Sequence, residues 1–159
     1  MLVIVIDVES LLAGVVALDA HELGDVEVAQ SVVELRRLVD ATDALWIRLL
    51  GEFDRRELWA PDGARSAAAW LRRECRLVHP TTATALLVAR AARALPASGA
   101  AFRAGTISFE HMRAIAPAAE PARREVALRA DPIFARAALW MNPRQMSNVV
   151  RTWLQLADG

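Results

Sequence analysis

Apolar residues recur at helical spacing along most of the chain, beginning with a long segment near the N-terminus. From Val26 onward they follow one another mostly three or four residues apart, and once seven apart, with charged residues between them: Val28, Val32, Leu35, Val39, Trp46, Leu49 and Phe53. This spacing places them on one face of an α-helix. We therefore predict one long helix from Val26 to Leu58, which forms a spine for the later helices. A dimeric coiled coil is disfavoured because fewer than four clean heptads are present.

Turn and capping signals divide the next part of the chain into two shorter helices. The Pro-Asp-Gly stretch at 61–63 is typical of a turn and ends the long helix. Ser66 is a suitable N-cap for a helix that continues to Arg76. Pro80 then suits the first turn of a helix that runs to Leu95, because proline lacks the N–H that goes unused there.

Similar signals predict five more helical segments toward the C-terminus. Gly105 is expected to be the left-handed residue that closes a short helix after Pro96, and Ser108 the N-cap of the following one. A further piece is predicted around 122–130. Asp131 and Pro132 have the pattern of an N-cap and first helical residue for residues 133–140. Asn142 and Gln145 predict a capping box at the start of the last helix.

The fold class that follows is all-α: a multi-helix bundle with one long N-terminal helix and an embedded helix-turn-helix-like pair. We expect residues 1–25 to form an N-terminal segment, with a short helix from about Val8 after a strand-like or irregular apolar start, and residues 26–159 to form a single helical domain. Acidic residues interrupt the apolar N-terminus, so it is not expected to be a signal peptide or membrane span. Cys75, the single cysteine, is expected to be buried and inert, which fits a cytoplasmic protein.

Charge is distributed unevenly although the formal net charge is zero. Residues 1–54 hold eleven acids and three arginines, a balance of −8; residues 55–113 hold four acids and ten arginines, +6; the remainder has four acids and six arginines, +2. A basic face of this kind is one mark of nucleic-acid binding. The alternative is that the acidic first helix neutralises the basic middle within one molecule. The nineteen basic residues are all arginine, which indicates codon bias or selection for bidentate phosphate contacts.

The helices predicted at 66–76 and 80–95, with a short turn between them, have the layout of a helix-turn-helix. In that motif the second helix enters the major groove of DNA and nearby residues contact phosphate. Threonine hydroxyls and arginines of this pair are therefore our candidate DNA-binding residues, expected to share one solvent-exposed face: Arg72, Arg73, Arg76, Thr81, Thr82, Thr84, Arg90 and Arg93. The alternative is structural, because such pairs are common in helical proteins and the threonines can serve only as caps.

Two stretches, "EFDRRELWAPDGARSAAAWLRR" at 52–73 and "GTISFEHMRAIA" at 105–116, resemble the actinobacterial domain of unknown function 222, which is usually found N-terminal to an HNH nuclease domain. The resemblance extends from about Val33 to Gly159. It implies an all-helical domain of a DNA-acting protein from a GC-rich actinobacterium or its phages. The catalytic nuclease part would then be missing from this sequence or be encoded separately.

A weaker similarity links the order helix, turn, helix, "ALP", short helix and "GTISFEHMRA" to the helix-turn-helix core of ParB-type partition proteins. It implies that Pro80–Thr84 lies at the major groove and that His111 and Arg113 belong to a structural helix that follows. The residue before the turn proline departs from the pattern, since His79 is a poorer N-cap than the usual serine.

No catalytic constellation is present, and we assign no catalytic, metal-binding or cofactor-binding residue. The three histidines, His21, His79 and His111, are widely separated and there are no paired cysteines, so an HNH metal site cannot be assembled from them. His111 is expected to be a partly buried, hydrogen-bonded residue rather than a general base.

Three functional hypotheses remain open. The first is a DNA-binding targeting domain whose partner is double-stranded DNA. The second is an interaction or oligomerisation module, with an exposed apolar strip on the first helix or around Trp140–Leu156 and a homodimer as its product. The third is an inactive fragment of an HNH endonuclease that requires a separate nuclease chain. None of the three involves a membrane.

Overall fold

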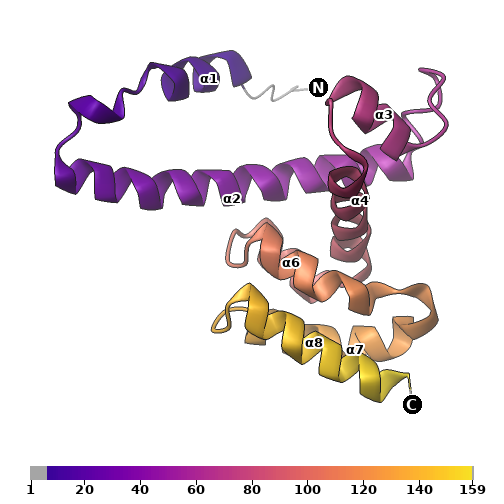
Figure 1. Cartoon of the computed structure of the whole chain (residues 1–159). Coiled ribbons are helices and arrows are strands. Elements are labelled where there is room, and N and C mark those ends of the chain that lie inside the picture. Colours follow the sequence, from indigo (N-terminus) through magenta and orange to yellow (C-terminus); the bar gives the residue numbers. More distant parts are fainter. Residues whose placement is uncertain (1–6, 159) are drawn as a thin grey trace, which may run out of the picture. The chain divides into compact units, whose positions relative to one another are not determined.

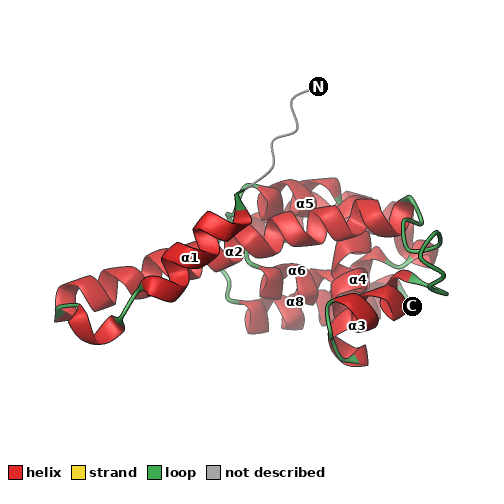
Figure 2. Ribbon diagram, turned by 90° about the horizontal axis from the view of Figure 1, so that it is seen from above, coloured by secondary structure: helices red, strands yellow, loops and turns green. Residues whose placement is uncertain are grey.

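The computed structural model describes residues 7–158, which consist of α-helices, short 3-10 turns and loops with no strand among them (Figures 1 and 2). The all-α class predicted from the sequence is confirmed. Contacts divide the chain into a first unit, residues 1–36, and a second unit, residues 37–159. Within the described residues, no helix combines the length and the apolarity needed to cross a bilayer.

The first unit contains α1 (Val8–Ala17), the 3-10 turn η1 (Ala20–Glu22) and the beginning of α2 (Asp25–Arg55). The Asp7 carboxylate caps α1 by accepting a hydrogen bond of 3.0 Å from the backbone N–H of Ser10. The short helix expected from about Val8 is confirmed, whereas the irregular start expected before it lies outside the described residues. None of residues 7–36 is buried, so these residues carry apolar side chains but form no core among themselves.

The long helix predicted from the sequence is confirmed as α2, which ends at Arg55 rather than Leu58. Glu57 and Gly63 adopt positive φ angles of 52° and 71°, so the backbone reverses direction through the predicted Pro-Asp-Gly turn. In the second unit, α2 buries one face, formed by Ala44, Ile47, Leu50 and Gly51. The helix therefore contributes its C-terminal half to the core of that unit.

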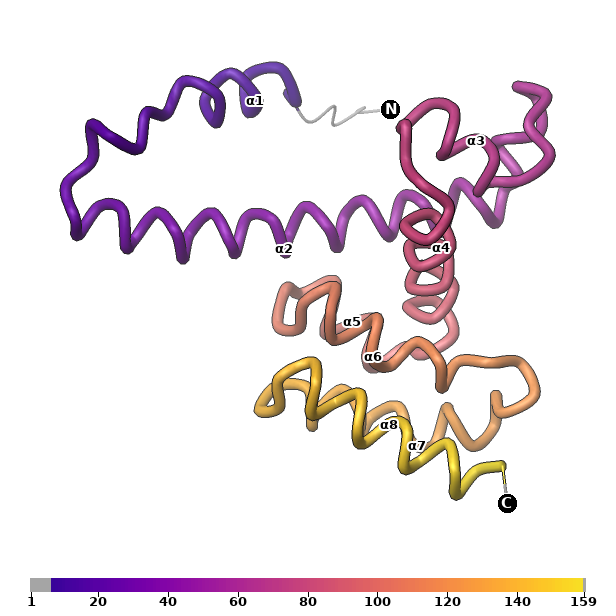
Figure 3. Tube along the Cα trace, in the orientation of Figure 1, coloured from indigo at the N-terminus to yellow at the C-terminus, as the bar shows by residue number. Residues whose placement is uncertain are grey.

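Six further helices build the second unit around α4. They are α3 (Ala67–Glu74), α4 (His79–Ala94), α5 (Pro96–Arg103), α6 (Phe109–Ile115), α7 (Arg124–Ala137) and α8 (Pro143–Ala157), with 3-10 turns η2 (Ala116–Ala119) and η3 (Pro121–Arg123). Helix α4 contacts α3, α5, α6 and η2, while α5 packs on α7. Helices α6 and α8 run side by side, as Figure 3 shows.

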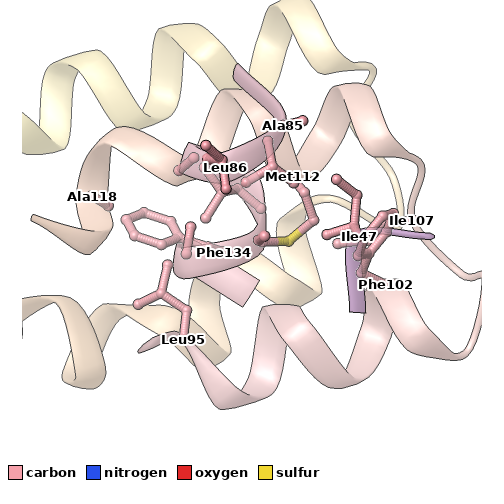
Figure 4. Packing of buried hydrophobic residues seen from close by; sticks show 14 of the residues in the cluster. Ile47, Ala85, Leu86, Leu95, Phe102, Ile107, Met112, Ala118 and Phe134 are labelled. Carbon is pink, nitrogen blue, oxygen red and sulfur yellow. The ribbon is translucent and has the colours of Figure 1, made fainter. Parts of the chain in front are cut away.

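The core of the second unit combines a few large side chains with many alanines. Figure 4 shows Met112 between Phe134 on one side and Ile47 with Phe102 on the other, and all four are at most 2% exposed. Ten of the buried hydrophobic residues are alanines: Ala44, Ala67, Ala85, Ala89, Ala91, Ala116, Ala118, Ala127, Ala130 and Ala138. Small side chains let helix axes approach closely. The short helices of this unit therefore fill its interior by packing near one another rather than by large side chains alone.

Most of the predicted helix caps are present. The Ser66 hydroxyl accepts from the N–H of Ala69 at 3.1 Å, and Asn142 and Gln145 form a reciprocal capping box with distances of 2.9 and 3.0 Å. Gly105 has φ 71°, as expected of a left-handed residue that closes a helix. Ser108 is the N-cap of α6. The boundaries predicted from these signals are therefore close to the observed ones.

Two predictions about the helices and the core are wrong. Asp131 and Pro132 do not begin a helix: α7 runs through both of them from Arg124 to Ala137. The buried carboxylate of Asp131 instead accepts hydrogen bonds from the start of α5, which is a tertiary role that local sequence does not reveal. Cys75 is exposed rather than buried, because it is the C-terminal cap of α3 at the edge of a turn.

Candidate nucleic-acid interface

The helix, turn and helix expected at 66–95 are α3, residues 75–78 and α4. Arg76 lies in this turn with φ 54°, a left-handed conformation that glycine often occupies in such turns. Its side chain is exposed and has no ion-pair partner among the described residues. The backbone of Arg76 therefore carries a steric penalty in this turn, and that penalty does not depend on what its side chain contacts.

Replacing Arg76 by glycine is expected to stabilise the protein by about 0.5–1 kcal/mol, because glycine adopts positive φ without the steric penalty of a Cβ. Chemical denaturation followed by circular dichroism measures this change. Arg76→Ala is the matched variant: it removes the same charge but keeps the Cβ, so it should show no such gain. A glycine variant no more stable than the alanine variant would contradict the interpretation.

The three threonines at the start of α4 have different environments. Thr82 is fully buried, and its hydroxyl donates to the carbonyl of His79 at 2.8 Å. It therefore serves the helix start and presents nothing to a ligand. Thr81 is exposed and Thr84 half-buried. Of the predicted threonine contacts, only these two remain on the surface.

The arginines predicted on α4 do not share a face with these threonines. Arg90 follows Thr81, and Arg93 follows Thr84, by nine residues, which is about two and a half turns of helix and so half a turn apart in direction. The Arg90 guanidinium is held by the carboxylate of Asp54 on α2, with Nε at 2.9 Å. This hydrogen bond raises the pKa of Arg90 above its ordinary value. The structure therefore does not bring the α4 arginines and threonines together.

The arginines at the end of α3 are also partly engaged. The Arg73 Nε donates to Glu74 at 2.5 Å, and its Nη1 lies 3.3 Å from the carbonyl of Asp62 in the preceding turn. Arg72 is exposed and makes no hydrogen bond to a described residue. The expected single face of arginines and threonines is not formed, because the α4 arginines point away from Thr81 and Thr84, and because Arg73 and Arg90 bind carboxylates.

A different surface accompanies Thr81 and Thr84. An open groove of about 430 Å³ lies between the start of α4, the part of α2 around Trp46, and α6. Its lining contains both threonines and is mostly apolar beneath them: Asp43, Trp46, Pro80, Thr81, Thr84, Ala85, Phe109, Glu110 and Arg113. The exposed start of α4 is therefore one wall of a groove whose other wall is α6.

A second groove, of about 590 Å³, shares Glu110 and Arg113 with the first and continues onto α8. Polar side chains make up nearly all of its lining: Glu110, Arg113, Pro143, Arg144, Ser147, Asn148 and Arg151. The α8 members follow at three- and four-residue spacing and so share one face. The opposite face of α8 buries Met146 and Val150, which fixes the direction of the polar face.

Three arginines and one carboxylate give this α6–α8 groove a positive balance. The Glu110 carboxylate is bound by Arg113, with Oε2 2.9 Å from Nε. Arg151 binds the amide oxygen of Asn148, and Arg144 has no partner among the described residues. The groove also lies beside the N-terminus of α8, where the helix dipole favours anions. It is suited to hold a phosphate group.

His111 connects the two walls of this groove. Its Nδ1 lies 2.8 Å from the Ser108 hydroxyl and 3.2 Å from the Ser108 backbone nitrogen, completing the capping box of α6. Its Nε2 lies 2.9 Å from the carbonyl oxygen of Met141, just before α8. A neutral ring that donates from Nε2 and accepts at Nδ1 satisfies both contacts. The partly buried, hydrogen-bonded role expected for His111 is confirmed.

Replacing His111 by alanine is expected to cost about 1–2 kcal/mol, because it leaves the Ser108 N–H and the Met141 carbonyl without partners. His111→Gln is the informative comparison, since glutamine at this position forms an ordinary capping box but is not expected to replace the ring's bond to Met141. We expect it to recover about half of the loss in a urea titration. Full recovery would show that the bond to Met141 contributes nothing.

Comparison with known proteins decides the family. The sequence model of the family described as "Domain of unknown function (DUF222)" matches residues 27–158. The chain belongs to the DUF222 family. Neither a curated protein nor a solved structure matches it. The family membership expected from the motifs at 52–73 and 105–116 is thereby confirmed, and the DUF222 description itself assigns no function.

In this DUF222 chain, sequence reasoning missed the groove residues on α8. Arg144, Asn148 and Arg151 recur at helical spacing opposite Met146 and Val150, so a helical projection of 143–157 would have grouped them. Nothing in the sequence, however, indicated that Arg113 lies beside them. Within residues 7–158, no group of three histidine, cysteine or acidic side chains is placed to hold a metal ion.

Proposed function

We propose that this DUF222 chain is a non-catalytic DNA-binding domain that contacts the double helix along the α6–α8 groove and the start of α4. The observation that carries the proposal is the gathering of Arg113, Arg144 and Arg151 in one polar groove continuous with the exposed end of the second helix of a helix-turn-helix-like pair. Thr82, Arg90 and Arg93 are left out of the contact set because of their burial, direction or partners.

Phosphate is the expected ligand of the α6–α8 groove. Arg144 and Arg151 can donate in pairs to phosphate oxygens, and releasing counterions from DNA then favours binding. Ser147 and the amide of Asn148 add neutral donors of the kind that hold a DNA backbone in register. To bind phosphate, Arg113 must break its ion pair with Glu110. This costs little free energy because both side chains are about half exposed.

Base edges are the expected contacts of the adjoining groove. Thr81 is exposed at the start of α4, where a methyl group and a hydroxyl can meet a thymine methyl or a base-edge acceptor. The carboxylates of Asp43 and Glu110 line the same groove. Carboxylates do not suit the DNA backbone, but they accept hydrogen bonds from the amino group of cytosine. In this arrangement α8 contacts the phosphate groups and the start of α4 contacts the bases.

A salt titration of duplex binding tests the proposal. Fluorescence anisotropy with labelled double-stranded DNA is measured for the natural chain, for Arg144→Ala/Arg151→Ala and for Arg129→Ala/Arg136→Ala. The last pair changes the net charge equally, on exposed positions of α7 outside the groove. We expect the groove variant to bind at least about tenfold more weakly at low salt and to lower the slope of log affinity against log salt by about 2.

Three outcomes contradict the proposal: no binding by the natural chain at low salt, equal binding by natural chain and groove variant, or equal losses in both variants. An Arg72→Ala/Arg73→Ala/Arg90→Ala variant separates the groove from the surface expected from sequence alone. A larger loss there than in the groove variant would assign binding to the α3–α4 arginines instead.

The resemblance to nuclease-associated proteins extends this proposal by one step. DNA binding by this chain would target a nuclease carried by another domain or another chain. A pull-down of purified candidate nuclease domains on this chain, with and without duplex DNA, tests that step separately from DNA binding.

A further inference from the structure

Large apolar side chains are exposed along both helices of the first unit. Helix α1 has no buried residue, although Val8, Leu11, Leu12 and Val15 recur at the spacing of one helix face and are each 53–57% exposed. Its acidic residue Glu9 follows Val8 directly and so lies about 100° away around the helix. Helix α1 therefore has an amphipathic pattern with its apolar face unburied.

The start of α2 repeats this feature. Val28, Val32 and Leu35 are four and three residues apart, which is the spacing of a coiled-coil seam, and they are 38–64% exposed. Glu27 and Glu34 each precede a seam residue, about 100° away around the helix, so the acids lie off the stripe. The unit is thus a helical hairpin, formed by α1 and the start of α2 and joined by residues 18–24 (Figure 1). Each of its two helices has an apolar stripe.

The apolar area that the first unit exposes is about as large as the apolar area that one subunit buries in a stable dimer. Nine large aliphatic side chains on or beside these stripes are 38–82% exposed: Val8, Leu11, Leu12, Val15, Val16, Leu18, Val28, Val32 and Leu35. A side chain of this kind has roughly 60–120 Å² of area when fully exposed, and these nine are on average a little over half exposed, so they present on the order of 450 Å² of apolar area. A standard interface buries about 800 Å² per partner, somewhat over half of it apolar, which is about the same apolar area.

We infer that the first unit is a dimerisation element that pairs with the same unit of a second copy of this chain. Two helical hairpins, each with two apolar stripes and no core, complete one four-helix bundle when they are packed face to face. The arrangement is self-complementary, so the same residues of both copies meet and the assembly closes as a dimer. This inference does not depend on DNA binding, which the proposed function assigns to the second unit.

Charge provides a test that separates a second copy from a basic partner protein. Residues 7–35 hold seven carboxylates and no arginine: Asp7, Glu9, Asp19, Glu22, Asp25, Glu27 and Glu34. Two copies of this unit repel each other, and added salt screens that repulsion. Self-association through these helices is therefore expected to tighten as salt increases. Docking of a basic partner would weaken under the same conditions.

Sedimentation equilibrium of the full chain, from micromolar to near-millimolar concentration and from low to high salt, measures the association. We expect a monomer–dimer equilibrium whose affinity rises with salt. Val32→Glu/Leu35→Glu should weaken dimerisation at least about a hundredfold, since four apolar side chains per dimer are lost. Leu49→Glu is the matched control, because Leu49 is 59% exposed on the second-unit part of the same helix; it should leave the dimer affinity unchanged.

The inference is overturned by a chain that stays monomeric at every concentration and salt. It is equally overturned by a dimer that Val32→Glu/Leu35→Glu leaves intact, or that weakens with salt. Because both replaced residues are exposed and outside the core of the second unit, the variant keeps the second unit folded, which a circular dichroism melt of the same sample verifies.

Discussion

Gly99→Ala is expected to destabilise the second unit by about 2–4 kcal/mol. A Cβ built on Gly99 in α5 would lie 2.1 Å from the carbonyl oxygen of Ala92 in α4 and 3.1 Å from its carbonyl carbon. Backbone atoms cannot rotate away as a side chain can, so α4 and α5 would have to separate. Overpacking of a tight interior costs about 1–3 kcal/mol and occasionally more, and the better helix propensity of alanine offsets up to about 1 kcal/mol.

Gly51→Ala is the matched control for this prediction. Gly51 is also buried and helical in the second unit, but a Cβ there meets the flexible Arg93 side chain at 3.4 Å and lies 3.6 Å from the nearest backbone oxygen. The free energy of unfolding of Gly51→Ala is expected to stay within about 1 kcal/mol of that of the natural chain, because the better helix propensity of alanine and slight crowding oppose each other. Urea unfolding of the three proteins measures the difference. Equal stability of both variants would contradict the close approach of α4 and α5.

Asp131→Ala is expected to cost about 3–5 kcal/mol, a large effect for the loss of one polar side chain. The Asp131 carboxylate is 1% exposed and accepts from the N–H of Ala97 at 2.6 Å, and from both the N–H and the hydroxyl of Ser98 at 3.0 and 2.6 Å. Helix α5 has no N-cap side chain of its own, so this carboxylate on α7 caps it across the fold. Its removal leaves three donors unpaired, two of them from buried Ser98.

Two further variants distinguish the contribution of the capping hydrogen bonds of Asp131 from that of the volume of its side chain. Asp131→Asn keeps the shape and one acceptor oxygen but loses the charge and turns an NH2 group toward donors, so we expect a loss of about 2 kcal/mol. Ser98→Ala removes only the hydroxyl donor and should cost about 1 kcal/mol. Thermal and urea unfolding measure this order. If Asp131→Ala were as stable as the natural chain, the carboxylate would contribute nothing as a cap of α5.

The candidate interface illustrates how local and tertiary information differ. Sequence spacing placed Thr81 at an exposed helix start and recognised the α3–α4 pair, because both depend on caps and turns within a few residues. It also grouped Arg90 and Arg93 with Thr81 and Thr84. That grouping is wrong, because two residues nine positions apart on a helix point in directions that differ by half a turn. The partner of Arg90, Asp54, lies 36 residues earlier in the chain.

What the sequence by itself determined is most of the helices of the second unit and most of their ends, since helix periodicity, serine and asparagine caps and left-handed glycines act over one or two turns. It wrongly divided the continuous helix α7 into two. The tertiary structure alone decided that Asp131 caps another helix, that Cys75 is exposed, and that Arg113 joins Arg144 and Arg151 around one groove. These outcomes depend on which helices meet and in what rotation. The close packing of many alanine faces decides that rotation, and no local pattern records it.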